Sequence, residues 1–318
     1  MDVYPLWSMT SLGVLSLLVI TSNIAVCILV LCTRSLRTYT NGFVVSLAFA
    51  DILIGLALFI QYPLQVESPV ALNVMYSVSL LSSVANLCAV TYDRYLAVLQ
   101  PLRYTPTIAK YFFRILVGVW VTGLVSAVIP LTWFPSTSGV IHQVYQFVML
   151  VAGIIIPYTF IFICYWRIYK QVRICVAKER KLSRLVCDRV ELTKCRRISS
   201  EAKLAKVFIV ISVMFVLSWL PVIYVTAVIA IGKPELMIKA LNSSSPFTLA
   251  LGSLVNPILY SFLKPDFKFA IRKLVQSLFR GDRYYKDVTR KKSSGDISRL
   301  EVTMLSQRHS SIVTVSEM

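Results

Sequence analysis

The sequence has few charged residues for its length. Asp, Glu, Lys and Arg make up 15% of the 318 residues, whereas 57% of the residues are hydrophobic. Soluble domains carry a larger share of charge. The composition therefore argues against soluble domains and favours a lipid bilayer as the surrounding solvent.

The sequence also lacks several patterns that identify common binding and structural sites. It has no internal repeat, no Gly-rich phosphate loop and no zinc-ligand spacing. Its seven cysteines, at positions 27, 32, 88, 164, 175, 187 and 195, all fall in apolar segments or on the side expected to face the cytoplasm. Because disulfides form in oxidising compartments, we predict no structural disulfide, and we interpret the cysteines of the apolar segments as small packing residues.

Long apolar segments dominate what is present. A membrane-spanning helix needs about 20 mostly apolar residues, and seven segments meet this requirement. Inside all seven, Asp51 is the only full charge. The predicted spans are Ser11–Cys32, Gly42–Pro63, Val70–Tyr92, Ile115–Pro135, Val144–Trp166, Val207–Gly232 and Ser243–Leu263.

The distribution of basic residues predicts the orientation of these spans. The first apolar segment has no basic residue before it and is followed by Arg34 and Arg37, the reverse of a cleavable signal peptide. With the N-terminus outside, every Lys and Arg except Lys233 and Lys239 falls on the inner side, as the positive-inside rule requires. The net charge of +18 is thereby explained by anionic lipid and cytoplasmic partners, and we expect no nucleic-acid partner.

The chain divides into four parts on this interpretation. Residues 1–8 form a short extracellular N-terminus and residues 9–264 hold the seven spans. In residues 265–280 apolar side chains recur at helical spacing with basic residues between them, which predicts an amphipathic helix on the membrane surface. Residues 281–318 are polar and rich in Ser and Lys, so we expect a disordered cytoplasmic tail.

Short motifs occur in order along the spans. They are Asn23 in the first, LAFAD ending at Asp51 in the second, DRY at Asp93, Arg94 and Tyr95 in the third, Trp120 in the fourth, Pro157 and Tyr165 in the fifth, FVLSWLP from Phe215 to Pro221 in the sixth, and NPILY from Asn256 to Tyr260 in the seventh. With these motifs the chain, from about residue 10 to 280, resembles the rhodopsin-like (class A) G-protein-coupled receptors. The resemblance implies an all-α membrane protein, a seven-transmembrane helix bundle with a short amphipathic eighth helix.

The resemblance implies a switch at the inner end of the third span. Arg94 needs anionic partners: Asp93 is adjacent, and Glu201 occupies the family position that pairs with this arginine in the resting state. An Arg–carboxylate bond is charge-assisted and can be bidentate, and breaking it would free the sixth span to move outward. A heterotrimeric G protein would then meet Arg94, and arrestin and receptor kinases are further expected partners. The remaining residues assigned to this switch are Tyr95, Tyr165, Asn256, Pro257 and Tyr260.

Two further groups of residues carry over by resemblance. Val84, Pro157, Phe215, Trp219 and Pro221 are expected to form the connector below the ligand pocket. Ser83, Ser253 and Asn256 are expected to face Asp51, so a sodium ion is one interpretation of that buried carboxylate, because oxygen ligands suit hard cations. A protonated aspartate in a water network is the other interpretation.

The expected ligand pocket is defined by what it lacks. Tyr76 stands where receptors for biogenic amines have an aspartate, and Ala250 replaces the Schiff-base lysine of the opsins. The other pocket positions offer no charge to an ammonium or carboxylate, so we predict an uncharged, largely apolar ligand. A pocket filled by its own side chains, with no small ligand, is the alternative. The predicted pocket residues are Tyr76, Ser77, Leu80, Met149, Gly153, Val222, Ile223 and Thr226.

Two modification sites follow from short motifs. Asn242 begins the only sequon expected outside, and its closeness to the seventh span makes glycosylation doubtful. Ser199 follows two arginines, a pattern that favours a basophilic kinase. Phosphorylation there would place about −1.5 to −2 charges at the base of the sixth span; an unmodified serine in a basic loop is the alternative.

Two other functional classes compete with a receptor. A channel or transporter needs polar residues along a path or broken helices at the membrane centre, and Asp51 alone gives this little support. An intramembrane aspartyl protease needs two facing carboxylates, and Asp51 has no partner of that kind. We therefore expect a multi-pass protein of the cell membrane that relays an extracellular signal without chemistry of its own.

Overall fold

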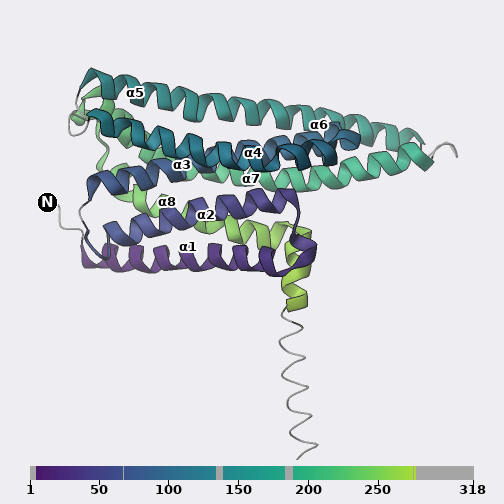
Figure 1. Cartoon of the computed structure of the whole chain (residues 1–318), viewed down its shortest axis with the longest axis horizontal. Helices are drawn as coiled ribbons and strands as arrows, with labels where there is room; N and C mark the ends of the chain where they lie inside the picture. Colours follow the sequence, from purple (N-terminus) through teal and green to yellow (C-terminus); the bar gives the residue numbers. More distant parts are fainter. Residues whose placement is uncertain (1–4, 67, 134–138, 183–188, 275, 277–318) are drawn as a thin grey trace, which may run out of the picture. The chain divides into compact units, whose positions relative to one another are not determined.

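The computed structural model describes residues 5–66, 68–133, 139–182, 189–274 and 276. Within this part of the chain the secondary structure is helical, and seven helical segments are long and apolar enough to cross a membrane. The prediction of a seven-helix membrane protein is confirmed. Figure 1 shows the helices lying side by side, with their long axes close to parallel.

The first four spans are single helices whose ends follow local sequence signals. They are α1 (Leu6–Cys32), α2 (Tyr39–Gln61), α3 (Pro69–Leu99) and α4 (Pro101–Val128), the last continued by a short 3₁₀ turn (Ile129–Trp133). The Thr38 hydroxyl caps α2 by accepting the Asn41 N–H at 3.3 Å. Pro69 and Pro101 open α3 and α4, where a missing N–H costs nothing.

The fifth span contains an irregular turn that the sequence did not predict. α5 (Val140–Leu150) passes through a π-helical turn (Val151–Ile155) into α6 (Ile156–Leu182), and the Ile156 N–H bonds to the Val151 carbonyl five residues earlier. Pro157 follows directly and cannot donate a backbone hydrogen bond. The wider turn accommodates the proline, and π turns of this kind occur mostly at functional positions.

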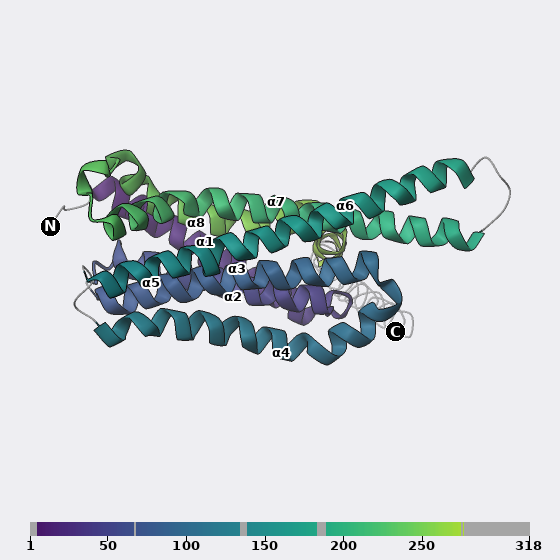
Figure 2. The same cartoon turned by 90° about the horizontal axis from the view of Figure 1, so that it is seen from above.

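The sixth and seventh spans are α7 (Arg189–Ile231) and α8 (Lys239–Leu263). α7 ends at Ile231 and is followed by Gly232, whose φ of 71° is the left-handed conformation of a helix cap. Pro221 lies inside α7, and Pro246 and Pro257 lie inside α8. Figure 2 shows α6 and α7 extending together beyond the other helices at one end, where the sequence places the basic inner segments.

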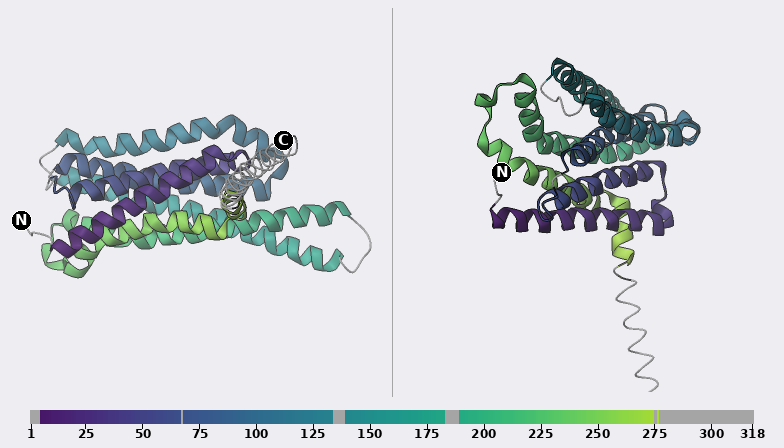
Figure 3. Two further views of the ribbon diagram at one scale, coloured as in Figure 1. Left: turned by 90° about the horizontal axis from the view of Figure 1, so that it is seen from below. Right: turned by 60° about the vertical axis from the view of Figure 1, so that its left-hand side comes forward.

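Small and polar side chains join the helices, as expected when no water is available to drive packing. The Asn23 side chain of α1 donates to the Ser253 carbonyl of α8 at 3.4 Å, and these two helices run beside each other in Figure 3. The Trp120 indole of α4 donates to the Ser46 hydroxyl of α2 at 3.0 Å. The first bond joins α1 to α8, and the second joins α4 to α2, the helix that carries Asp51.

The predicted surface helix after α8 is partly described. Residues 265–274 are helical, and residues 277–280 lie outside the described residues, as does the predicted disordered tail. The four-part division of the chain remains a prediction.

Candidate functional site

The inner end of α3 holds a buried ion pair. The Arg94 guanidinium lies 2.6 Å from a carboxylate oxygen of Asp93, and a second guanidinium N–H donates to the same oxygen at 3.0 Å. Asp93 is fully buried and Arg94 is 4% exposed. A buried pair of this kind is held by its hydrogen bonds, because burial of the separate charges is unfavourable.

Two neutral residues complete this cluster. The Thr40 hydroxyl donates to Asp93 Oδ2 at 2.6 Å, and the Tyr104 hydroxyl donates to Asp93 Oδ1 at 3.0 Å. They lie in the first turns of α2 and α4, so the cluster connects three helices. Sequence reasoning missed both residues, since each lies outside the predicted spans and carries no motif that links it to Asp93.

The second predicted carboxylate partner of Arg94 in the switch is Glu201. The side chain of Glu201 lies outside the described residues, so its pairing with Arg94 remains a prediction. The side chain of Ser199 is likewise outside them, but its backbone position differs from the expectation. α7 begins at Arg189, so Ser199 lies inside the helix, whereas we expected it in a loop just before the sixth span. Because the helix dipole acts at the first turn, a phosphate at Ser199 would not gain from it.

Two of the three tyrosines assigned to the switch form hydrogen bonds between α3 and α6. The Tyr165 hydroxyl of α6 accepts a hydrogen bond from Thr91 of α3 at 3.3 Å. The Tyr95 hydroxyl accepts one from Arg167 of α6 at 3.3 Å. Tyr260 of α8 is fully buried, and its hydroxyl has no hydrogen-bond partner among the described residues.

Asp51 is 2% exposed and lies on α2 at the centre of a polar group. Its Oδ2 accepts from the Asn256 amide at 2.8 Å, and the Ser253 side chain is a second hydrogen-bond partner. Ser83 is also buried. The structure thus brings Asp51 together with Ser253 and Asn256 as the resemblance implied. Their roles stay predictions.

The connector residues form a packed layer between the two ends of the bundle. The rings of Phe215 and Trp219 lie 5.8 Å apart at an interplanar angle of 31°, and both are buried together with Val84. Pro157 follows the π turn, and its carbonyl lies 3.8 Å from the Cys88 thiol of α3. Trp219 lies on α7 one helical turn before Val222 and Ile223, which line the cavity.

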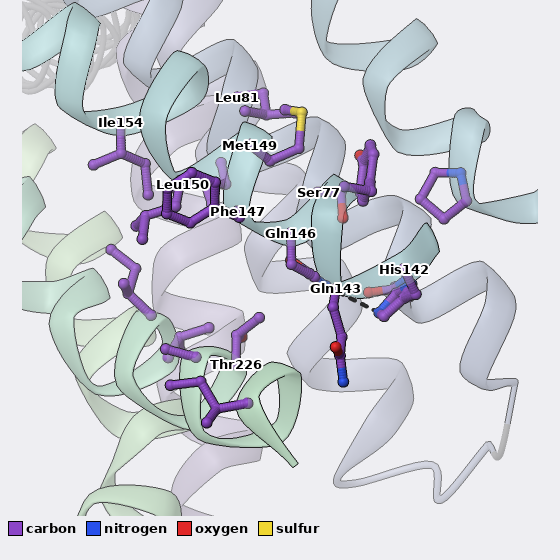
Figure 4. Close-up of a pocket in the computed structure, with 18 residues that line it drawn as sticks. Ser77, Leu81, His142, Gln143, Gln146, Phe147, Met149, Leu150, Ile154 and Thr226 are labelled. Carbon is purple, nitrogen blue, oxygen red and sulfur yellow. Dashed lines mark hydrogen bonds between the residues drawn. The ribbon is translucent and has the colours of Figure 1, made fainter. Parts of the chain in front are cut away.

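A cavity of about 510 Å³ opens between α3, α5 and α7 (Figure 4). A volume of this size suits a small-molecule ligand. Its lining includes six of the predicted pocket residues, which are Ser77, Leu80, Met149, Val222, Ile223 and Thr226. Gly153 does not line the cavity, but a Cβ there would lie 2.9 Å from the Leu81 side chain, which does.

The assignment of Tyr76 to this cavity was wrong. Its hydroxyl donates to the Gln61 side chain of α2 at 2.7 Å, and Tyr76 does not line the cavity. Tyr76 and Ser77 are neighbours on α3, so their side chains point about 100° apart around the helix. Ser77 faces the cavity and Tyr76 faces α2.

The expectation of a largely apolar pocket was also incomplete. Figure 4 shows His142, Gln143 and Gln146 together at one end of the cavity, whereas Leu81, Leu150 and Ile154 line the other end. Sequence reasoning missed this polar end, because the outer part of the fifth span has no motif that assigns its residues to a pocket.

Hydrogen bonds fix the chemistry of the polar end. The Trp133 indole donates to His142 Nδ1 at 3.2 Å. An indole nitrogen only donates, so Nδ1 must be unprotonated and the proton lies on Nε2. Nε2 is 3.2 Å from the Gln146 side-chain nitrogen. The nitrogen and oxygen of an amide are assigned from the hydrogen-bond network, and a protonated Nε2 needs an acceptor. We therefore assign the Gln146 oxygen to the position that faces Nε2 and the NH₂ group to the other branch of the amide.

Comparison with known proteins decides the family. The family described as 7 transmembrane receptor (rhodopsin family) matches residues 22–260, which is most of the chain. The chain belongs to this family. The structure of squid rhodopsin has the same fold, with a TM-score of 0.73 and 22% sequence identity over 87% of this chain and 88% of that chain.

The relatives of this rhodopsin-family receptor carry names of different kinds. A melanopsin-like protein of Danio rerio is 28% identical over 86% of this chain, and octopamine receptor beta-1R of Drosophila melanogaster is 26% identical over 84%. The chain spans about three-fifths of the length of these two relatives, 59% and 61%. Histamine H2 receptor of Homo sapiens is 28% identical over 83% of this chain and 77% of that receptor.

The family match favours the receptor class over the two other classes considered from the sequence. Members of the rhodopsin family are receptors and not enzymes, and the match does not favour a channel or transporter.

Asn242, the doubtful glycosylation site, is exposed in the first turn of α8, and its modification remains a prediction.

Proposed function

We propose that this rhodopsin-family receptor lies in the cell membrane with its N-terminus outside and relays an extracellular signal to a heterotrimeric G protein by rearrangement of its helices. The observation that carries the proposal is the buried Asp93–Arg94 cluster at one end of α3, with a cavity at the other end. α7 runs past both, so a change at the cavity can move its inner end. Arrestin and receptor kinases are further proposed partners.

We propose an uncharged ligand with an apolar body and one polar group. No Asp, Glu, Lys or Arg is among the described residues that line the cavity, so an ammonium or carboxylate would lose its hydration without gaining a partner. The apolar end suits a hydrocarbon body, and the Gln146 NH₂ group suits a hydrogen-bond acceptor on the ligand. This separates the receptor from its amine-binding and opsin relatives, whose charged anchors it lacks at Tyr76 and Ala250.

Signalling without a small ligand is the second candidate function, because the cavity is bordered by large apolar side chains that can fill it. Second-messenger measurement in cells that express the receptor without added ligand separates the two. Cells that are silent without ligand but respond to an agonist found by screening favour a ligand-dependent receptor. A high basal signal that Arg94→Ala removes favours constitutive activity. No second-messenger response either without ligand or with the screened compounds would contradict the receptor function.

Ser77→Trp tests the cavity as the ligand site. The indole would occupy a substantial part of the 510 Å³, so we expect the response to an uncharged agonist found by screening to fall at least about tenfold in potency. Ser77→Ala, which removes only the hydroxyl, is the matched control. An unchanged agonist response in Ser77→Trp, at equal surface expression, would place the ligand elsewhere.

We also propose a sodium ion at Asp51, for which the supporting observation is the buried oxygen set of Asp51, Ser83 and Ser253. A bound ion would stabilise the arrangement of α2, α3 and α8, the helices that carry Asp51, Ser83 and Ser253. Asp51→Asn keeps the shape but loses the negative charge that offsets cation dehydration. We therefore expect sodium to raise the melting temperature of the purified wild-type receptor and not that of Asp51→Asn.

The comparison is made across sodium concentrations, with potassium added to keep the ionic strength constant. A melting temperature of the wild type that does not change with sodium would support the protonated aspartate instead.

Phosphorylation of Ser199 is proposed as a regulatory modification, and phosphopeptide mapping with Ser199→Ala as control tests its occupancy.

A further inference from the structure

Lys264, the residue that follows α8, has its side chain almost completely buried, with 2% exposed. The Lys264 ammonium donates to the Asn41 side chain of α2. It lies 5.6 Å from the ring centroid of Phe208 on α7 and 5.2 Å from that of Phe267. The charged group is thus enclosed by α2, α7 and the turn after α8, at the inner end of the bundle.

These contacts only partly replace water around the ammonium. A lysine ammonium has three N–H donors, and among the described residues Asn41 alone accepts a hydrogen bond from it. Cation–π attraction to the two rings adds to this. Among the described residues, the charged groups that act on Lys264 are Arg94 and Asp93 of α3 and Asp266 in its own turn, and its described contacts on α2 and α7, which are Asn41 and Phe208, are uncharged.

The balance of these effects disfavours the charge. Burial first, and then the positive charge of Arg94, lower the pKa of the Lys264 ammonium from 10.5 to about 8, although Asp266 and Asp93 act in the opposite direction. The ammonium is therefore less stable here than in water. Near neutral pH the Lys264 amine nevertheless keeps its proton. The closed arrangement of the helices therefore contains a buried charge that is less stable than it would be in water.

We propose that Lys264 is an activation residue whose buried charge opposes the closed position of α7 and is released to water when the inner end of α7 moves away. Among the described side chains of α7, Phe208 lies over the ammonium, so its departure opens a path for hydration. The inference rests on the proposed receptor function, in which α7 moves. The alternative is that Lys264 stabilises the closed position, because its hydrogen bond and ring contacts would hold α7 in place. Our proposal predicts the opposite effect on α7.

Lys264→Met tests the sign, because methionine keeps an unbranched apolar chain and removes the charge. The position of α7 is measured in the purified receptor, without a G protein, from the distance between spin labels at Lys110→Cys of α4 and Lys206→Cys of α7, both exposed, with the native reactive cysteines replaced. We define the open fraction as the fraction of receptor molecules in which the two labels are far apart. We expect Lys264→Met to lower this open fraction at least about twofold. Lys268→Met, which removes an exposed lysine one turn further on, should leave the fraction unchanged.

The pH dependence gives an independent readout. Because the pKa of Lys264 is lower in the folded receptor than in the unfolded chain, the unfolded chain binds more protons between these two values, and stability rises with pH there. From about pH 7 to about pH 9.5, the melting temperature of the wild type should rise toward that of Lys264→Met, and its open fraction should fall. Lys264→Met should show neither change.

The outcomes separate this inference from the proposed function. An open fraction that rises or stays equal in Lys264→Met, or a difference in melting temperature between the two proteins that does not depend on pH, would overturn the role of Lys264. Both measurements use the receptor alone, so they are valid even if no second-messenger response is found. A failure of G-protein coupling would appear only in cells.

Discussion

Arg94→Ala should reduce G-protein signalling at least about tenfold while the receptor still reaches the cell surface. In the structure the guanidinium is buried against Asp93, and in the proposed active state it faces the G protein. Alanine supplies neither the charge nor the fork of N–H donors. The fold should survive because Asp93 keeps the Thr40 and Tyr104 hydroxyls as donors. Second-messenger output at matched surface expression is the measurement.

Two control variants sharpen this result. Arg114→Ala removes an exposed arginine of α4 and should signal normally, which shows that the loss is specific to position 94. Arg94→Lys keeps the charge but loses the planar fork, so an intermediate signal is expected. Normal coupling in Arg94→Ala would contradict the proposed contact between Arg94 and the G protein.

The seven spans were predictable because the bilayer requires long apolar segments, and such segments can be recognised directly from the order of the residues. The helix ends were less predictable. The fourth span was predicted to begin at Ile115, but α4 begins at Pro101, because Arg103, Lys110 and Arg114 lie on a part of the helix that extends out of the apolar region. α7 similarly begins at Arg189, well before the predicted Val207.

The candidate site was predictable only where a motif marks it. Asp93 and Arg94 are adjacent in the sequence, so their pairing needs no knowledge of the fold. Thr40 and Tyr104 reach Asp93 only because the first turns of α2 and α4 lie beside α3. The same holds for the polar end of the cavity, where Trp133 and His142 come from opposite sides of a connection. Lys264 belongs to no motif in the sequence, and its burial follows only from the packing of the inner ends of α2 and α7 around it.

Gly252→Ala should destabilise the receptor by about 1–3 kcal/mol through overpacking, a large fraction of the stability of a folded domain. A Cβ at position 252 of α8 would lie 2.3 Å from both Cβ and Oγ of Ser218 on α7, closer than any real contact. Ser218 is buried and its hydroxyl donates to the Phe215 carbonyl at 2.8 Å, so it has little room to move. We expect α7 and α8 to separate at the level of Trp219. A lower melting temperature and lower surface expression are the measured results.

Two further variants make this prediction specific to the contact between the helices. Gly118→Ala on α4 is the control, since a Cβ there meets no atom within 4 Å and alanine favours the helix over glycine by about 1 kcal/mol; its melting temperature should equal or exceed that of the wild type. Ser218→Gly removes the atoms that a Cβ at position 252 would meet. Combined with Gly252→Ala, it should recover most of the lost stability, giving a coupling of at least about 1 kcal/mol in the double-mutant cycle. Additive losses in the double variant would mean that α7 and α8 do not approach each other at this point.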